Sequence, residues 1–277
     1  NRLIPILLLR NGWLVQSKEF SRYQNLGNPT TAVQRISEWG SDELIYLDIS
    51  RDHIYDIKRD DQNYPNRQSF MEIIEDVSKV TFMPITVGGK INSLSDIENR
   101  LKLGADKISI NSKAIIEPAF INLSATEFGS QCIVVSIDVK LHNQVYYVYD
   151  HKHSCITELS VFDFSKRVES MGAGEILLNS VDRDGMAYGY DINLLNLVAD
   201  NVDIPVIACG GVGDWHHFQE AFEKTNVDAV AAANIFHYRD QSVYLAKNYL
   251  FENNLPVRKP DLLTINLNLL LLFVLTM

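Results

Sequence analysis

The chain has 277 residues, of which 46% are hydrophobic and 22% are charged, a composition that suits one large globular domain or two small ones. Its formal net charge of -10 argues against DNA or RNA as a partner, because nucleic-acid binding depends on Lys and Arg contacts with phosphates. Three scattered cysteines, Cys132, Cys155 and Cys209, fit reduced thiols in a cytoplasmic protein better than a disulfide framework.

Apolar runs that predict strands alternate with helical patterns along almost the whole chain. The first run, Leu3 to Leu9, leads directly into a turn and predicts a buried strand rather than a signal peptide. Strands are predicted at residues 3–9, 43–49, 83–87, 107–110, 132–139, 175–180, 205–209 and 229–232. Helices are predicted at residues 30–39, 68–80, 94–103, 118–128, 161–171, 192–199, 215–223 and 243–253. About eight such units favour a closed (β/α)8 TIM barrel, of α/β class, over a doubly wound sheet.

The second half of the sequence echoes the first. Residues 40–45, GSDELI, resemble residues 172–177, GAGEIL, and the sequence VGG at residues 87–89 returns as CGG at residues 209–211. The two echoes occur in the same order, which favours a barrel built from two half-barrel repeats. We therefore expect a barrel over residues 1–258, followed by a tail at residues 259–277.

The end of the chain differs in character from the predicted barrel. Residues 262–277, from Leu262 to Met277, carry no charge, but the run is shorter than the roughly 18 residues of a membrane span and contains Asn266 and Asn268. We expect a flexible or partner-covered apolar tail rather than a membrane segment. A third alternative is a sequence remnant without a selected function.

Two glycine pairs follow predicted strands in the two halves. Gly88-Gly89 and Gly210-Gly211 would expose backbone N–H groups next to helix starts, an arrangement that can bind phosphate. The polar residues that could add side-chain donors after the neighbouring strands are Asn111, Ser112 and Asn234. The alternative is that the glycines only relieve crowding at the turns. Two phosphate loops in opposite halves would suit a ligand with two phosphates.

Carboxylates stand at the carboxyl ends of predicted strands, where α/β barrels carry their chemistry. Asp138 ends the strand at residues 132–139, and Asp184 follows the strand at residues 175–180. Burial can raise the pKa of such groups and make them general acids or bases. We interpret Asp138 and Asp184 as the catalytic candidates and Asp48 as a structural acceptor. At the position that matches Asp138 in the first half-barrel stands Leu8.

At the opposite ends of the strands, four charged residues predict an ionic ring across the barrel floor. These residues are Arg2, Glu43, Lys107 and Glu175. The ring could be a structural plug, as floor residues of such barrels usually are, or a gate for a small neutral molecule. The spacing alone favours the plug.

The sequence offers weak signals for metals and cofactors. His151, His153 and Cys155 alternate as ligands on one strand face could, but the tyrosines at residues 147–149 fit a solvated hairpin better. Nucleophile elbows, Walker loops and dinucleotide fingerprints are absent from the sequence. We therefore predict no metal and no cofactor.

Several segments together resemble the HisF family, the cyclase subunit of imidazole glycerol phosphate synthase. They are residues 106–112 (DKISINS), 128–140 (FGSQCIVVSIDVK), 172–185 (GAGEILLNSVDRDG), 204–213 (IPVIACGGVG) and 234–237 (NIFH), and the resemblance runs from about Arg2 to Arg258. It implies a barrel of two halves that binds a bis-phosphorylated ribulosyl aminoimidazole at its upper face. It further implies a HisH-type glutaminase, bound as a heterodimer at the lower face, that delivers ammonia through the barrel. The implied products are imidazole glycerol phosphate and an aminoimidazole carboxamide ribotide, as in histidine biosynthesis.

The resemblance also implies roles for individual residues. Asp138 matches one of the two central acid/base carboxylates, with Asp184 as an assisting acid. The two phosphate sites would contain Gly89, Asn111, Gly211 and Asn234. The four floor residues match the ammonia gate of the family, which raises the gate above the plug, and Asp106 resembles a residue at the glutaminase interface.

The departures from the family pattern lie on the upper face. Leu8 stands where the family has its other catalytic aspartate, and leucine cannot transfer a proton. Other differences are Gln16 for a lysine, Lys90 for the third glycine of a loop, Met186 for a threonine, and Cys209 and Asn234 for serines. One hypothesis is a paralogue that passes ammonia to a sugar amidotransferase in surface-polysaccharide synthesis. The others are a working cyclase of histidine biosynthesis and a decayed duplicate.

Overall fold

Eight parallel strands form a closed barrel in the computed structural model, which describes residues 1–18, 22–50 and 69–260. Around the barrel the strands follow the order β1, β4, β5, β6, β7, β10, β11 and β12, and pairing of β12 with β1 closes it. Their bounds are β1 Arg2–Arg10, β4 Leu44–Asp48, β5 Ile85–Gly88, β6 Lys107–Ile110, β7 Ile133–His142, β10 Glu175–Ser180, β11 Val206–Cys209 and β12 Ala229–Ala232. The predicted (β/α)8 barrel is confirmed.

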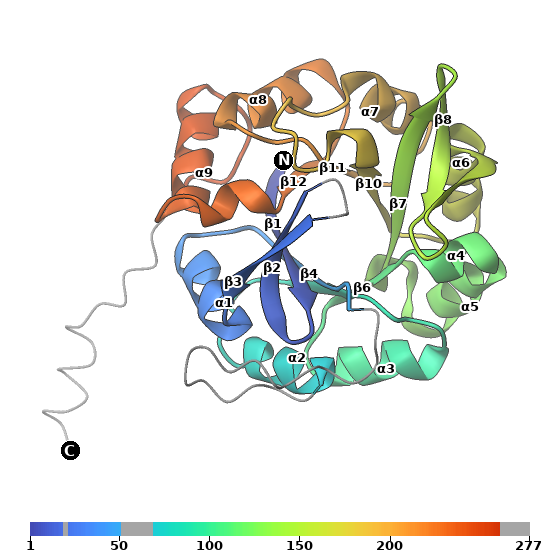
Figure 1. Ribbon diagram of the computed structural model, residues 1–277, viewed down its shortest axis with the longest axis horizontal. Helices are drawn as coiled ribbons and strands as arrows, with labels where there is room; N and C mark the ends of the chain where they lie inside the picture. Colours follow the sequence, from blue (N-terminus) through green and yellow to red (C-terminus); the bar gives the residue numbers. More distant parts are fainter. Residues whose placement is uncertain (19–21, 51–68, 261–277) are drawn as a thin grey trace, which may run out of the picture.

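Helices surround the strands on the outside (Figure 1). They are α1 Pro29–Glu38, α2 Phe70–Ser78, α3 Leu94–Lys102, α4 Ser112–Ile116, α5 Ala119–Phe128, α6 Val161–Ser170, α7 Ile192–Ala199, α8 Trp215–Lys224 and α9 Ser242–Glu252. Three short 3-10 turns are η1 Ser130–Cys132, η2 Val181–Arg183 and η3 Asn234–His237. Every predicted helix has an observed counterpart with closely similar bounds, because each buries one apolar stripe against the strands. Among the described residues no helix is long and apolar enough to cross a membrane.

Two hairpins extend the barrel beyond the predicted units. β2 (Trp13–Lys18) and β3 (Arg22–Gly27) pair antiparallel beside β1, and these two strands were missed by the sequence analysis. The expected hairpin after the fifth barrel strand is β8 (Val145–Asp150), with β9 (Cys155–Ser160) beside it. Asn143 and Gln144, both with positive φ, form the two-residue turn between β7 and β8, which suits the twist of a hairpin.

The strands bury side chains on both of their faces. Outward-facing residues pack under the helices in one large apolar cluster. Inward-facing residues form a second cluster inside the barrel: Ile4, Ile6, Ile45, Val134, Leu177, Ile207, Ala229 and Ala231. Strands that are covered on both faces consist of continuous apolar runs, and these runs made the strands easy to predict from the sequence. The barrel interior is therefore a packed core between a polar upper face and a charged floor.

A repeated aspartate ties neighbouring strands together at the floor. Asp42 accepts a hydrogen bond from the Leu3 amide at 2.9 Å, and Asp228 accepts one from the Val206 amide at 3.0 Å. Asp106 does the same for the Ile85 amide at 2.8 Å. Gly174 stands at the corresponding place before β10, where a Cβ atom would lie 2.1 Å from the Ser130 carbonyl oxygen. The contact thus recurs before three of the barrel strands, whereas the division of the barrel into two halves stays a prediction.

Candidate functional site

Asp138 lies in the middle of β7, near the end of the part that pairs with β10, and its side chain faces the barrel interior. Its Oδ1 accepts a hydrogen bond from Nδ2 of Asn179 at 2.8 Å, and its Oδ2 accepts one from Nδ2 of Asn111 at 3.1 Å. The residue is only 7% exposed. Burial raises the pKa of this carboxyl above its usual value, although the two amides and the nearby His151 oppose the shift. Asp138 can therefore hold or release a proton closer to neutral pH than an exposed aspartate.

The side of the upper barrel formed by the first strand is apolar. Leu8 packs against the interior cluster together with Leu47, Cys209 and Ala233, and we call these four residues the apolar collar. Strand register places Leu8 beside Leu47, and it places Asn179 between Asp138 and Cys209. Asp138 thus shares the upper end of the barrel with the apolar collar. Within the collar, Cys209 alone carries a group, its thiol, that can exchange a proton.

The two acids after β10 have different surroundings. Asp184 accepts a hydrogen bond from Oγ of Ser17 at 3.3 Å, and Asp182 accepts one from the backbone amide of Leu141 at 2.8 Å. Asp182 therefore fastens the β7–β8 hairpin. Burial, with the charges of Asp184 and Asp138, raises the pKa of the Cys209 thiol. The two predicted catalytic acids therefore lie in the same part of the barrel, close enough to Cys209 to keep its thiol protonated.

The two glycine pairs are required by close backbone packing. Gly89 has φ of +107°, and a Cβ atom there would lie 2.3 Å from the Asp48 carbonyl oxygen. Gly211 has φ of +103°, and its Cβ atom would lie 2.2 Å from the Gly189 carbonyl oxygen. The crowding alternative therefore accounts for the glycine residues themselves. Their phosphate-binding role stays a prediction, since both loops still end at the upper face.

The polar residues predicted beside these loops already bond within the protein. Nδ2 of Asn111 donates to the Ser136 carbonyl oxygen at 3.0 Å in addition to Asp138. Nδ2 of Asn234 donates to the Ser17 carbonyl oxygen at 2.6 Å, and Oγ of Ser112 lies 3.4 Å from Oδ1 of Asn111. The side chains that we predicted as phosphate donors thus also connect the upper ends of neighbouring elements.

One buried arginine was missed by the sequence analysis. Arg100 of α3 is 3% exposed, and its Nη2 donates to the Gly89 carbonyl oxygen at 2.8 Å while its Nη1 donates to the Asp96 carbonyl oxygen at 2.8 Å. Beside it, Lys90 has φ of +55° and its Nζ lies 3.5 Å from Oδ2 of Asp48. No sequence signal marks this arginine, because an arginine on an amphipathic helix normally points to solvent. Asp48 also accepts hydrogen bonds from Ser50, in keeping with its predicted structural role.

The four charged floor residues meet in one ring. Nη1 of Arg2 lies 2.6 Å from Oε1 of Glu43 and 2.8 Å from Oε1 of Glu175. Nζ of Lys107 lies 3.1 Å from Oε2 of each of the same two glutamates. Burial opposes the charge of Arg2, but both glutamates together raise its pKa. The ring thus balances two positive and two negative charges at the lower end of the apolar interior. The role of the ring as a gate stays a prediction.

The remaining predicted residues are placed as follows. Asp106 lies at the floor, next to a cavity of about 370 Å³ that Phe82 and Met83 also line. His153 bonds to Asp150 with 2.6 Å between Nδ1 and Oδ2, whereas His151 interacts electrostatically with Asp138. Cys155 is exposed on β9. Among the described residues no group of three or more His, Cys, Asp or Glu side chains could hold a metal ion.

Comparisons with known proteins cover almost the whole chain. A family model described as "Histidine biosynthesis protein" matches residues 2–242. The imidazole glycerol phosphate synthase subunit HisF of Bacillus pumilus is 40% identical over 259 residues, which are 93% of this chain and 98% of that protein. The HisF subunit of Hydrogenobaculum sp. is 42% identical over 258 residues, 93% and 98% of the two chains. A putative imidazole glycerol phosphate synthase subunit hisF2 of Vibrio vulnificus is 42% identical over 257 residues, 93% and 90% of the two chains.

Proposed function

Because this chain belongs to the histidine biosynthesis protein family and, within it, to the HisF subunits, we propose that it binds a HisH-type glutaminase at the barrel floor and receives ammonia through the barrel. The ammonia then passes to a third protein, a sugar amidotransferase of surface-polysaccharide synthesis, rather than into imidazole ring closure. The chain is thus a paralogue of the cyclase in which the conduit is kept and the ring-closing chemistry is lost.

The observation that carries this proposal is the position of Leu8. It occupies the interior-facing upper end of β1, the half-barrel equivalent of Asp138, and it packs within the apolar collar. Of the residues that we predicted as catalytic, Asp138 and Asp184 both belong to the second half of the chain, and Leu8 offers no acid or base on the side of β1. Loss of one acid/base group typically lowers a rate by a factor of about 10² to 10⁴. One relative carries the name hisF2, which is in keeping with paralogous HisF-type proteins.

The composition of the barrel interior supports transport of a neutral molecule. Between the charged floor and the apolar collar, the inward-facing side chains are aliphatic or small, including Ile4, Leu177 and Ala231. A charged ammonium ion would lose its hydration in such a lining, whereas neutral ammonia is far less costly to transfer. The ring of floor charges forms the entrance to this lining, and there the charged ammonium ion and neutral ammonia would interact differently with the protein.

A second candidate function is the cyclase reaction itself. Asp138 is buried with a raised pKa, Asp184 is retained, and both glycine loops open onto the same face. A bis-phosphorylated ribulosyl aminoimidazole bound there would have one general acid or base within the barrel. In this alternative a second proton donor replaces the missing aspartate, and the protein belongs to histidine biosynthesis.

The deciding experiment measures steady-state turnover of the bis-phosphorylated ribulosyl substrate with saturating ammonium salt, which removes any need for the glutaminase. The unmodified protein is compared with Leu8→Asp, and Leu8→Asn is the matched control because it is equally polar and similar in size but cannot transfer a proton. Under our proposal the unmodified protein and Leu8→Asn are inactive. Activity in Leu8→Asp would show a barrel whose chemistry was lost at one residue.

Turnover by the unmodified protein at about 1 s⁻¹ or faster, an ordinary enzymatic rate, would contradict the conduit proposal and establish the cyclase. The partner is tested separately by glutamate release from a HisH-type glutaminase with and without this protein. Under the proposal the barrel stimulates glutamine hydrolysis, and addition of the sugar amidotransferase with its sugar substrate transfers the released nitrogen to the sugar.

A further inference from the structure

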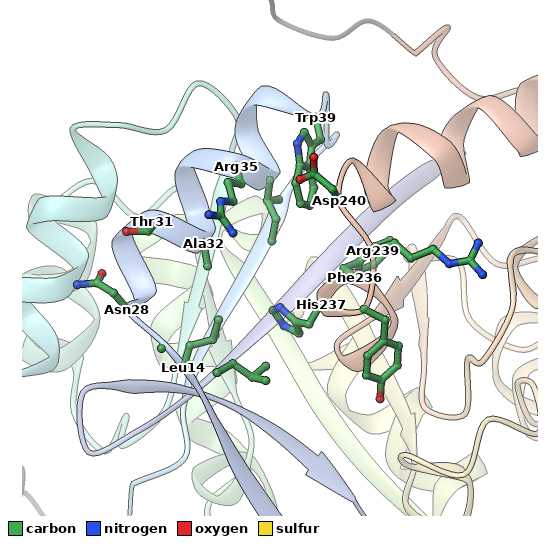
Figure 2. Close-up of a pocket in the computed structure, with 14 residues that line it drawn as sticks. Leu14, Asn28, Thr31, Ala32, Arg35, Trp39, Phe236, His237, Arg239 and Asp240 are labelled. Carbon is green, nitrogen blue, oxygen red and sulfur yellow. The ribbon is translucent and has the colours of Figure 1, made fainter. Parts of the chain in front are cut away.

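A cavity of about 460 Å³ lies outside the barrel interior, between α1 and the segment that joins β12 to α9 (Figure 2). Leu14 of β2 and Leu26 of β3 form its apolar floor, α1 forms one wall and η3 the other. The volume falls within the range of about 300 to 1,000 Å³ that is typical of sites for small organic ligands. Neither the predicted catalytic acids nor the glycine loops line it.

A cation faces this cavity from α1. Arg35 lies in the last turn of the helix, and Figure 2 shows its guanidinium turned toward the space between the two walls. Within residues 1–18, 22–50 and 69–260, no carboxylate forms an ion pair or hydrogen bond with this guanidinium. In a protein with a formal net charge of -10, such a cation is an available binding partner for an anion.

On the opposite wall stands a neutral imidazole. His237 ends η3, and its ring points into the cavity toward α1 (Figure 2). Burial lowers its pKa to about 4, so the ring carries one N–H donor and one bare nitrogen acceptor at neutral pH. The described residues provide no hydrogen-bond partner for either nitrogen. Neither nitrogen belongs to the described buried polar atoms that lack a partner, so both can be reached from solvent by a ligand with a matching polar group.

The remaining walls combine flat apolar contact with polar residues, among them Asp240. Trp39 follows α1 as its C-cap residue, and Ile36 lies one turn before it. Phe236 precedes His237 and stacks on Trp215 with 6.3 Å between the ring centroids, which fixes the position of that wall. An aromatic ring stacked against such surfaces contributes apolar burial that a bare inorganic anion cannot provide.

We propose that this cavity, which we call the α1–η3 site, binds a small organic anion with a flat ring. The acidic group pairs with Arg35, the ring packs against Trp39 and Ile36, and a polar atom of the ligand bonds to His237. The site also adjoins the upper face, because η3 carries Asn234 at its first residue and His237 at its last. Asn234 bonds to the Ser17 carbonyl oxygen, so an occupant contacts the turn that supports the predicted phosphate site.

The test uses two matched probes, indole-3-acetate and its neutral amide, indole-3-acetamide, titrated into the full-length protein. Binding is followed by the indole N–H signal of Trp39 in ¹⁵N NMR, assigned with a Trp39→Phe variant, and by calorimetry. We expect the acid to bind with a Kd below about 1 mM and the amide to bind at least 10-fold more weakly, the ratio set by one lost charge-assisted hydrogen bond.

Two variants separate the site from general surface binding. Arg35→Gln should weaken indole-3-acetate binding at least 10-fold, whereas Lys79→Gln should leave it unchanged, because Lys79 is an exposed cation that does not line the cavity. Circular dichroism confirms that both variants fold. No shift of the Trp39 signal at saturating acid, equal affinities for acid and amide, or unchanged binding in Arg35→Gln would each overturn the proposal. The result does not depend on the proposed ammonia transfer, because no catalytic activity is measured.

Discussion

Nη1 of Arg2 and Oε1 of Glu175 lie 2.8 Å apart across the floor of the barrel, although 173 residues separate them in the sequence. Arg2 opens β1, and Glu175 opens β10, which is not a neighbour of β1 in the sheet. Their ion pair therefore spans the barrel instead of running along its wall. Each glutamate of the ring is shared by both cations, so the loss of one anion affects the whole floor.

Glu175→Gln should destabilise the protein by about 1–3 kcal/mol, because two partly buried cations then share a single anion. The free energy of unfolding in urea measures this loss. The control is Glu75→Gln, which removes the exposed pair between Glu75 and Lys79 and should cost less than about 0.5 kcal/mol. Equal losses in both variants would show that the floor ring adds nothing beyond an ordinary surface pair.

Asp138→Asn should remove the pH dependence that this residue contributes to stability, because an amide does not titrate. The folded-state pKa is raised above the unfolded value of 3.8, so the folded protein binds the proton more tightly. The contribution is therefore fully favourable below pH 3.8 and is lost as the pH rises through the folded-state pKa. The Asn179 amide can rotate to accommodate the new group, because its Oδ1 has no hydrogen-bond partner in the described structure.

The measurement is the difference in unfolding free energy between Asp138→Asn and the unmodified protein from about pH 4 upward. This difference should move in favour of the variant as the pH rises. A constant difference would show that Asp138 does not titrate with a raised pKa. If the protein is a working cyclase, the same variant should abolish turnover while it remains folded.

Gly89→Ala should destabilise the protein by more than about 2 kcal/mol, because the new Cβ atom would lie 2.3 Å from the Asp48 carbonyl oxygen at a positive φ. Gly172→Ala is the matched control. It also has a positive φ, +95°, but its nearest contact is the Ala125 Cβ atom at 3.1 Å. The stability loss in Gly172→Ala should therefore stay near the 1 kcal/mol that is typical of the backbone strain alone. It should be about half of the loss in Gly89→Ala or less. Thermal unfolding of both variants measures the contrast.

His237→Gln should protect the protein against acid. The folded-state pKa of about 4 lies below the ordinary histidine pKa of 6.5, so the unfolded chain binds the proton more readily between these values. Stability is unaffected above pH 6.5 and falls as the pH drops toward 4, by at most about 3 kcal/mol from this group. The variant should lack this part of the loss when unfolding free energies at pH 7 and about pH 4.5 are compared. Equal losses in both proteins would exclude an acid-sensitive His237.

The element order could be predicted from the sequence because strand and helix patterns are local. β6, β10 and β12 begin and end at the predicted residues, since an apolar run covered on both faces has sharp ends. The β2–β3 hairpin was missed because β3 is largely exposed and carries no alternating apolar pattern. The hairpin brings Ser17 beside Asp184, a contact without any sequence signal.

The candidate site was only partly predictable for a related reason. Asp138 could be selected because a carboxylate at the end of an apolar strand is costly unless it is used or satisfied. Arg100, which supports the Gly89 loop, could not, because a single arginine on an amphipathic helix normally points to solvent. The predicted apolar tail at residues 262–277 lies outside the described residues.

By itself the sequence determined the barrel and its charged floor residues, since both depend on residue type and spacing along one chain. The tertiary structure alone decided how those residues meet: four floor charges in one ring, Leu8 within an apolar collar, and Arg35 facing His237 across a cavity. The physical reason is closure. Only when β12 pairs with β1 do residues far apart in sequence come within bonding distance.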